Sequence, residues 1–114
     1  MIGSGISQIS CPQHVLDYSL KLLGERWTLL IIKEACAAPC RFDEICLRLG
    51  ISRTTLALRL RTLVEAEILM TSPIPCEPNR QYYRLSEQGE GLRIIVEMIA
   101  KWSEELNFED RRKK

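Results

Sequence analysis

The chain of 114 residues contains one histidine, few aromatic residues (6%) and no long hydrophobic run. With one histidine and no paired acidic or nucleophile motif, it holds no catalytic constellation, so an enzyme is not expected. The longest apolar run, WTLLII at 27–32, is far shorter than the roughly 20 residues that a membrane-spanning helix needs. The opening segment MIGSGISQIS has neither a basic nor a long apolar part, which argues against a secretory signal and favours a cytoplasmic protein.

Net charge and cysteine spacing also say little about the partners or metal sites of the protein. The formal charge is +1, so bulk charge indicates neither a nucleic-acid nor a membrane partner. The five cysteines have no framework spacing and include no Cys-x-x-Cys pair. That pattern is typical of free thiols in a reducing compartment, and it gives little support to a zinc site. We therefore expect no cofactor and no metal.

Apolar periodicity predicts one domain, 1–114, of α+β class: mainly helical with a small β-hairpin. Five helices are expected, at 12–23, 25–36, 42–49, 52–64 and 87–108. Gly50 is a natural end for the third helix, and Ser52 is a good N-cap for the fourth. The proline-rich segment MTSPIPCEPNRQYYRLS at 70–86 predicts a hairpin over about 69–86, with its tip at 75–79.

Two short helices joined by a glycine-containing turn, then a hairpin, are the order of a winged helix-turn-helix. The helix at 52–64 is then the candidate reader of the DNA major groove. Its apolar residues share about a third of the helix circumference and should pack on the core: Leu56, Leu60, Leu63 and Val64. The opposite side carries Thr54, Leu58 and Arg61, with Arg53 and Thr55 in the first turn beside free backbone N–H groups. Leu58 either contacts a thymine methyl group or is partly buried.

Positive charge is concentrated on this motif. No acidic residue lies between Glu44 and Glu65, whereas four arginines do: Arg48, Arg53, Arg59 and Arg61. Such a cluster can displace phosphate counterions from DNA. The alternative is a solvent-exposed helix face whose positive charge has no role in DNA binding. In the hairpin, Arg80 lies near the expected tip, where it can touch phosphate or enter the minor groove.

The last helix carries a second signal. A heptad seam is formed by Leu92, Ile95, Ile99, Trp102 and Leu106. One face can cover the core while another meets a partner chain, which predicts a homodimer. A dimer presents two reading helices to the two half-sites of a pseudo-palindromic operator in double-stranded DNA. A wholly intramolecular core helix is the alternative.

In order and spacing, several segments resemble the HxlR-type transcriptional regulators, relatives of the MarR group, over nearly the whole chain. They are CP at 11–12, Gly24 with RWTLLII at 26–32, RFDEI at 41–45, GIS at 50–52, LALRLRTL at 56–63 and PNRQYYRLSEQG at 78–89. The sequence departs from the family pattern at Glu25 and Glu67, which stand where glycines are common.

The resemblance implies a dimeric winged-helix DNA-binding regulator. Its N- and C-terminal helices would form the dimer interface, with Leu16 contributing from the first helix. By matching position, 52–61 is the reading helix, Arg80 is a wing residue and Arg41 can hold phosphate. The expected DNA-binding set is Arg41, Ser52, Arg53, Thr54, Thr55, Leu58, Arg59, Arg61 and Arg80.

Cys11 directly precedes Pro12, and proline suits the first helical position, so Cys11 is predicted to be the N-cap. Its thiol would then face the positive end of the helix dipole, which stabilises the reactive thiolate. Several members of the resembled family sense electrophiles or oxidants through a cysteine at this Cys-Pro position, so the resemblance implies redox sensing. Packing beside the dimer interface and metal ligation are the alternatives, and metal ligation is the weakest.

The sequence thus predicts a homodimeric DNA-binding transcriptional regulator that responds to thiol modification. A winged helix that binds proteins and never touches DNA is a second interpretation. A third is a metal-responsive repressor that uses Cys36, Cys40, Cys46 or Cys76.

Overall fold

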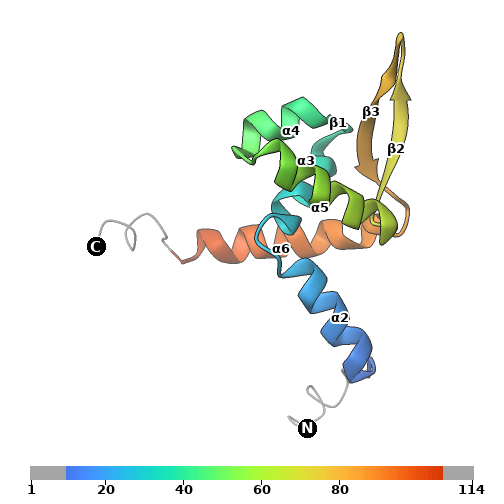
Figure 1. Cartoon of the computed structure of the whole chain (residues 1–114). Helices are drawn as coiled ribbons and strands as arrows, with labels where there is room; N and C mark the ends of the chain where they lie inside the picture. Colours follow the sequence, from blue (N-terminus) through green and yellow to red (C-terminus); the bar gives the residue numbers. More distant parts are fainter. Residues whose placement is uncertain (1–9, 107–114) are drawn as a thin grey trace, which may run out of the picture.

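The structure is a computed structural model that describes residues 10–106. Its elements are α2 (Gln13–Leu23), α3 (Thr28–Ala37), β1 (Cys40–Arg41), α4 (Phe42–Leu49), α5 (Arg53–Glu65), β2 (Leu69–Ile74), β3 (Glu77–Leu85), the 3-10 turn η1 (Gly89–Leu92) and α6 (Arg93–Glu104). Figure 1 shows α2 and the β2–β3 hairpin projecting from opposite sides of the helical body. The expected class, mainly helical with a small sheet in winged helix-turn-helix order, is confirmed. The end of the last predicted helix, 107–108, lies outside the described residues.

The core is built from one face each of α3, α4 and α5, closed by the base of the hairpin. Its buried members include Ile31, Ile32, Ile45, Leu56, Leu60, Leu63, Leu69 and Leu85. The predicted inner face of α5 is therefore confirmed, with Val64 packed at its margin. Burying each of these large aliphatic side chains contributes roughly 1.5–3 kcal/mol, so α5 presents its opposite face to solvent in a fixed orientation.

The turn between α4 and α5 follows the two predicted signals. Gly50 ends α4 in the left-handed conformation, with φ 68°, and its N–H donates to the Cys46 carbonyl at 2.9 Å. A side chain with a Cβ atom adopts that φ only at an energetic cost. Ser52 is the N-cap of α5, because its Oγ accepts the Thr55 N–H at 3.1 Å.

The sheet has three antiparallel strands in the order β1-β3-β2. The hairpin is confirmed, but its tip is shorter than expected: only Pro75 and Cys76 separate β2 from β3, and Cys76 takes a φ of 66°. Strand β1 pairs Cys40 with Tyr83 and was not predicted, because two residues carry no periodicity. It ties the start of α4 to the wing.

The starts of the second and last helices differ most from the sequence prediction. The second helix begins at Thr28 rather than 25, because the Glu25 carboxylate accepts the Trp27 N–H (2.9 Å) and the Thr28 hydroxyl (3.1 Å) just before it. The last helix is preceded by η1, where Ser86 Oγ accepts the Gly89 N–H at 2.8 Å. Over residues 10–106, no helix is long and apolar enough to cross a membrane.

Candidate nucleic-acid interface

The outward face of α5 is accessible as the helical wheel predicted. Ser52, Arg53, Thr54 and Arg61 are exposed, and Thr55 is half-buried. Leu58 is 48% exposed, so it is available for contact with a thymine methyl group. A shallow groove of about 620 Å³ runs along this face and is lined by Phe42, Arg53, Thr54, Thr55, Ala57, Leu58 and Arg61. This face can receive the edge of another macromolecule.

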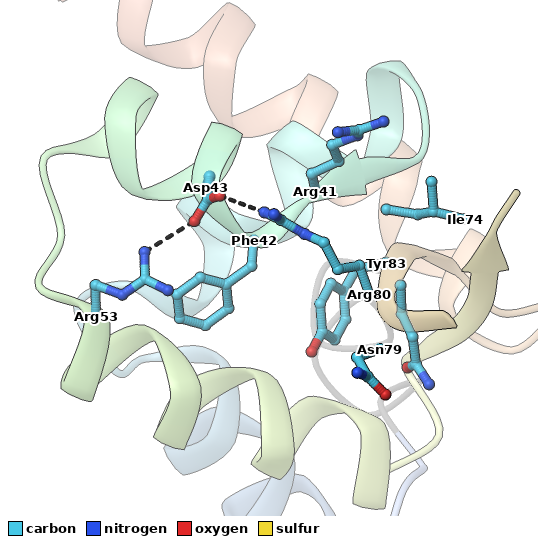
Figure 2. Close-up of a pocket in the computed structure, with 9 residues that line it drawn as sticks. Arg41, Phe42, Asp43, Arg53, Ile74, Asn79, Arg80 and Tyr83 are labelled. Carbon is cyan, nitrogen blue, oxygen red and sulfur yellow. Dashed lines mark hydrogen bonds and ion pairs between the residues drawn. The ribbon is translucent and has the colours of Figure 1, made fainter. Parts of the chain in front are cut away.

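A second groove, of about 550 Å³, separates the start of α5 from the wing (Figure 2). Three cationic side chains reach it from three elements: Arg41 before α4, Arg53 from α5 and Arg80 from β3. The phenyl ring of Phe42 supports the Arg53 guanidinium, whose central carbon lies 4.8 Å from the ring centroid. The predicted DNA-binding arginines of the reading helix and of the wing therefore border the same hollow.

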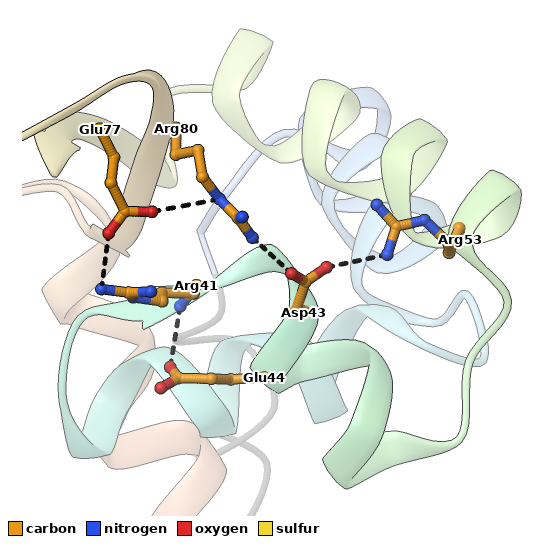
Figure 3. Close-up of polar contacts among 6 residues, drawn as sticks. All are labelled: Arg41, Asp43, Glu44, Arg53, Glu77 and Arg80. Atoms are coloured by element: carbon orange, nitrogen blue, oxygen red, sulfur yellow. Dashed lines mark hydrogen bonds and ion pairs between the residues drawn. The ribbon is translucent and has the colours of Figure 1, made fainter.

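These arginines are joined by carboxylates into one alternating chain (Figure 3). Asp43 accepts from Arg53 Nη1 at 2.8 Å and also from Arg80 Nη2. Glu77 then links Arg80 Nε, at 3.6 Å, to Arg41 Nη2, at 3.2 Å. Hydrogen bonds from Arg53 and Arg80 hold the pKa of Asp43 below its usual range, so the Asp43 carboxylate is ionised at neutral pH. Two carboxylates thus link three arginines in this chain.

Arg59 occupies a different place from the other predicted DNA contacts. It is half-buried, and its Nε lies 3.4 Å from Glu25 Oε2 in the turn before α3. Its position on α5, between the inner and outer faces, turns it toward α3 rather than toward solvent. Arg59 is therefore the least accessible arginine of the predicted DNA-binding set, and its contact with DNA stays a prediction. Arg61, two residues on, makes no ion pair within residues 10–106.

Cys11 is not the N-cap of the first helix. The structure assigns that position to Pro12, and α2 begins at Gln13, so Cys11 lies one residue before the N-cap. Its exposed thiol donates to the Pro12 carbonyl at 3.6 Å. The prediction failed because proline took the cap position instead of the first helical position. The Cys11 thiol therefore does not lie at the cap position, where the positive end of the helix dipole would stabilise a thiolate.

The other cysteines do not form a metal site. Burial raises the pKa of the Cys36 and Cys40 thiols, and the Cys40 thiol donates to the carbonyls of Glu34 and Ala38. Cys76 stands alone at the exposed wing tip. Within the described part of the chain, no three His, Cys, Asp or Glu side chains are grouped to hold an ion.

Helices α2 and α6 contain no buried residue. Of the predicted seam, Ile95, Ile99 and Trp102 are exposed, Trp102 by 60%. Leu92 packs against the core, and Leu16 and Leu106 are half-buried. Further exposed apolar side chains lie beside the seam and on α2: Ile94, Met98, Val15, Tyr18 and Leu20. The chain's own core leaves this surface uncovered.

Comparison with known proteins decides the family. Residues 22–111 match the family described as HxlR-like helix-turn-helix. The chain belongs to this family. An HTH-type transcriptional regulator of Mycobacterium tuberculosis is 42% identical over 87 residues, which are 76% of this chain and 55% of the relative. The chain thus spans about half the length of its mycobacterial relatives.

YodB of Bacillus subtilis, a second relative, is 33% identical over 97 residues, which are 84% of this chain and 85% of YodB. The structure of its reduced form has a TM-score of 0.71 with 32% identity, over 87% of this chain and 96% of YodB. YodB has also been solved after diamide treatment and with bound quinone. The reduced redox regulator HypR matches with a TM-score of 0.71 and 25% identity, over 79% of this chain and 90% of HypR. The mycobacterial relative and YodB are transcriptional regulators, and HypR is a redox regulator. The family is thus one of regulators and not of enzymes, which agrees with the prediction for this chain.

Two residues of the candidate interface, Asp43 and Glu77, were not predicted from the sequence. Asp43 lies in the quoted segment RFDEI, but it falls just outside the acid-free interval that marked the motif as basic. Its partner Arg80 is 37 residues away along the chain. Asp43 and Arg80 meet only because β3 returns to the start of α4. No local sequence pattern predicts that contact.

Proposed function

We propose that this chain is a homodimeric transcriptional regulator that binds a pseudo-palindromic operator in double-stranded DNA. The single observation that carries the proposal is the convergence of Arg53, Arg61 and Arg80 on the exposed side of a winged helix-turn-helix, around the grooves beside α5. In this proposal 1–114 forms one DNA-binding domain. Its bacterial relatives are regulators of transcription, so we also assign it to the cytoplasm, where bacterial DNA lies.

The reading helix α5 enters the major groove in this proposal. Thr54 and Leu58 then face base edges, and Arg61, farther along the same exposed side of the helix, contacts a phosphate. Arg53 and Arg80 contact phosphates on either side of the groove between α5 and the wing, since both guanidinium groups are exposed and keep free N–H donors. Arg41, which is held by Glu77, adds positive charge behind them.

A selection experiment tests this function. Sheared genomic DNA is incubated with the purified protein, and bound fragments are sequenced and footprinted. Two protected half-sites whose centres lie about 10 bp apart, or a multiple of that, support a dimer with one reading helix in each half-site. Failure to enrich any fragment at low salt would leave the protein-interaction interpretation standing in its place.

The proposed dimer uses the uncovered apolar faces of α2 and α6. A second copy of the chain is the occupant that we infer, because the exposed surface is continuous from Tyr18 to Ile95 across the hollow of about 380 Å³ between the two helices. Ile99→Glu should yield monomers in light scattering. Leu47→Glu is the matched control: Leu47 is 85% exposed but lies on α4. Equal dissociation by both variants, or by neither, would contradict this interface.

Thiol control through Cys11 is the remaining part of the proposal. Its support is the exposure of the thiol and the likeness to YodB, which has been solved with bound quinone. In the proposed reaction the Cys11 thiolate adds to a quinone ring: a C–S bond forms, the ring takes up a proton, and the product is a hydroquinone thioether. The adduct sits just before α2 and so disturbs the dimer interface.

Cys11→Ser should keep folding and DNA binding but lose the response of DNA affinity to a quinone. Cys76→Ser is the control, because Cys76 is also exposed but lies on the wing. Retention of the full response in Cys11→Ser would remove the sensor role. A response lost only in Cys76→Ser would place the reactive thiol on the wing.

A further inference from the structure

We propose that Asp43 is a positioning residue that sets the DNA specificity of this interface. It holds Arg53 of the reading helix and Arg80 of the wing in one arrangement, and it lowers the affinity for non-specific DNA. The inference rests on the proposed DNA-binding function and deepens it, because it gives an acidic residue a role at a surface built to meet phosphates.

The geometry is a two-sided clamp (Figure 3). Oδ1 of Asp43 accepts from Arg53 Nη1 at 2.8 Å, while Oδ2 accepts from Arg80 Nη2. Each carboxylate oxygen therefore serves one arginine, and the two arginines come from α5 and β3. Glu77 holds Arg80 from its other side, through Nε. Asp43 thereby fixes the positions of the wing and the reading helix relative to the first turn of α4.

The clamp leaves both arginines able to bind phosphate. A guanidinium group has five N–H donors, and Asp43 occupies only one on each arginine. The side chains of Arg53 and Arg80 stay 71% and 48% exposed. Asp43 thus fixes the directions of the remaining donors without consuming them. A duplex whose phosphates match these directions gains from the fixed arrangement, because the arginines lose less conformational freedom on binding.

Non-specific DNA responds differently to the same carboxylate. Non-specific binding depends on charge and not on register, so a negative charge between two arginines weakens it. Specific binding needs side chains that are held in the right place. Asp43 therefore weakens non-specific binding and supports specific binding. It raises the ratio of the specific to the non-specific affinity.

The experiment measures affinity for two duplexes: an operator recovered by the genomic selection, and a scrambled duplex of equal length and composition. For Asp43→Asn we expect tighter binding to the scrambled duplex, with a salt slope steeper by about one for each protomer. Binding to the operator should stay level or weaken. The specificity ratio should fall about tenfold, a small part of the 10³–10⁷ typical of regulators.

Glu65→Gln is the matched control, because Glu65 is an exposed acid at the end of α5, outside the clamp. Glu65→Gln removes one negative charge, as Asp43→Asn does. It should therefore raise the affinity for both duplexes and leave the specificity ratio unchanged. Asp43→Glu separates charge from geometry. It keeps the negative charge but lengthens the side chain, so non-specific binding should match the wild type while operator binding weakens.

Three outcomes would overturn the inference. Equal gains on both duplexes in Asp43→Asn mean that Asp43 only repels phosphate. Equal losses on both mean that it only supports folding, and the unfolding temperature of the same samples shows whether folding is affected. Wild-type ratios in both Asp43 variants mean that the clamp has no role. If the wild type itself selects no DNA, the proposed function fails, which is a separate result.

Discussion

The backbone of Gly89 passes directly over the carbonyl group of Ile68: a Cβ atom on Gly89 would lie 2.1 Å from the Ile68 oxygen. Ser86 reinforces this approach, because its hydroxyl donates to the same carbonyl at 3.1 Å and accepts the Gly89 N–H at 2.8 Å. Ile68 precedes the wing, and Gly89 begins the turn that leads into α6. The contact therefore fixes the proposed dimerisation helix to the base of the wing.

Gly89→Ala should lower the free energy of unfolding by about 2–3 kcal/mol, because the clash is with backbone and no side chain can move aside. Gly91→Ala is the control two residues later, where a Cβ atom would meet nothing within 4 Å. It should leave stability nearly unchanged. Urea denaturation of both variants measures the difference, and similar stability for the two would contradict the close approach.

Glu67 adopts a left-handed φ of 63° although it has a side chain. Because glycine reaches this conformation without steric cost, Glu67→Gly should stabilise the protein by about 0.5–1 kcal/mol. Glu65→Gly places the same substitution at the end of α5 and should instead destabilise by up to about 1 kcal/mol. Thermal unfolding should thus move in opposite directions for two glutamates that are two residues apart.

Glu25 joins the start of α3 to the middle of α5. Glu25→Ala removes the hydrogen-bond acceptor of the Trp27 N–H and of the hydroxyl of buried Thr28. It also removes the ion-pair partner of the half-buried Arg59. We expect a loss of about 2–3 kcal/mol in the free energy of unfolding, because buried polar groups are costly when unpaired. Lys21→Ala, which breaks an exposed ion pair with Asp17, should cost less than about 0.5 kcal/mol. Equal costs for the two would show that Glu25 is only a surface charge.

The Asp43 clamp should have a distinct pH signature. Because hydrogen bonds from Arg53 and Arg80 lower the pKa of Asp43 in the folded state, its contribution to stability is present above the unfolded pKa of about 4. That contribution is lost as the pH falls through the folded pKa. The difference in unfolding free energy between wild type and Asp43→Asn should therefore shrink on acidification. A difference that is constant from neutral pH down to strongly acidic pH would show that Asp43 is not tied to the arginines.

Local signals explain what the sequence could predict. The end of α4 at Gly50, the cap of α5 at Ser52 and the inner face through Leu56, Leu60 and Leu63 depend only on neighbours within a few residues. The same is true of the two strands of the wing. Such features follow from backbone preference and apolar spacing, which are visible in one sequence.

The parts that could not be predicted depend on distant segments. β1 exists because β3 returns to it, and Arg59 pairs with Glu25 because the fold brings α5 beside the turn before α3. Asp43 meets Arg80 for the same reason. Cys11 is a local error: both Pro12 as the cap and Pro12 as the first helical residue are compatible with the sequence, and the structure adopts the former.

The central claim is that α5 and the wing bind duplex DNA through their arginines. Its most direct test is the affinity of wild type, Arg61→Ala and Lys21→Ala for a selected operator across a range of salt concentrations. The wild type should lose affinity steeply and linearly on a log–log plot. Arg61→Ala should bind more weakly, with a slope shallower by about one for each protomer, while Lys21→Ala, which removes the same charge from α2, should match the wild type. Identical slopes for Arg61→Ala and wild type, or binding insensitive to salt, would contradict the claim.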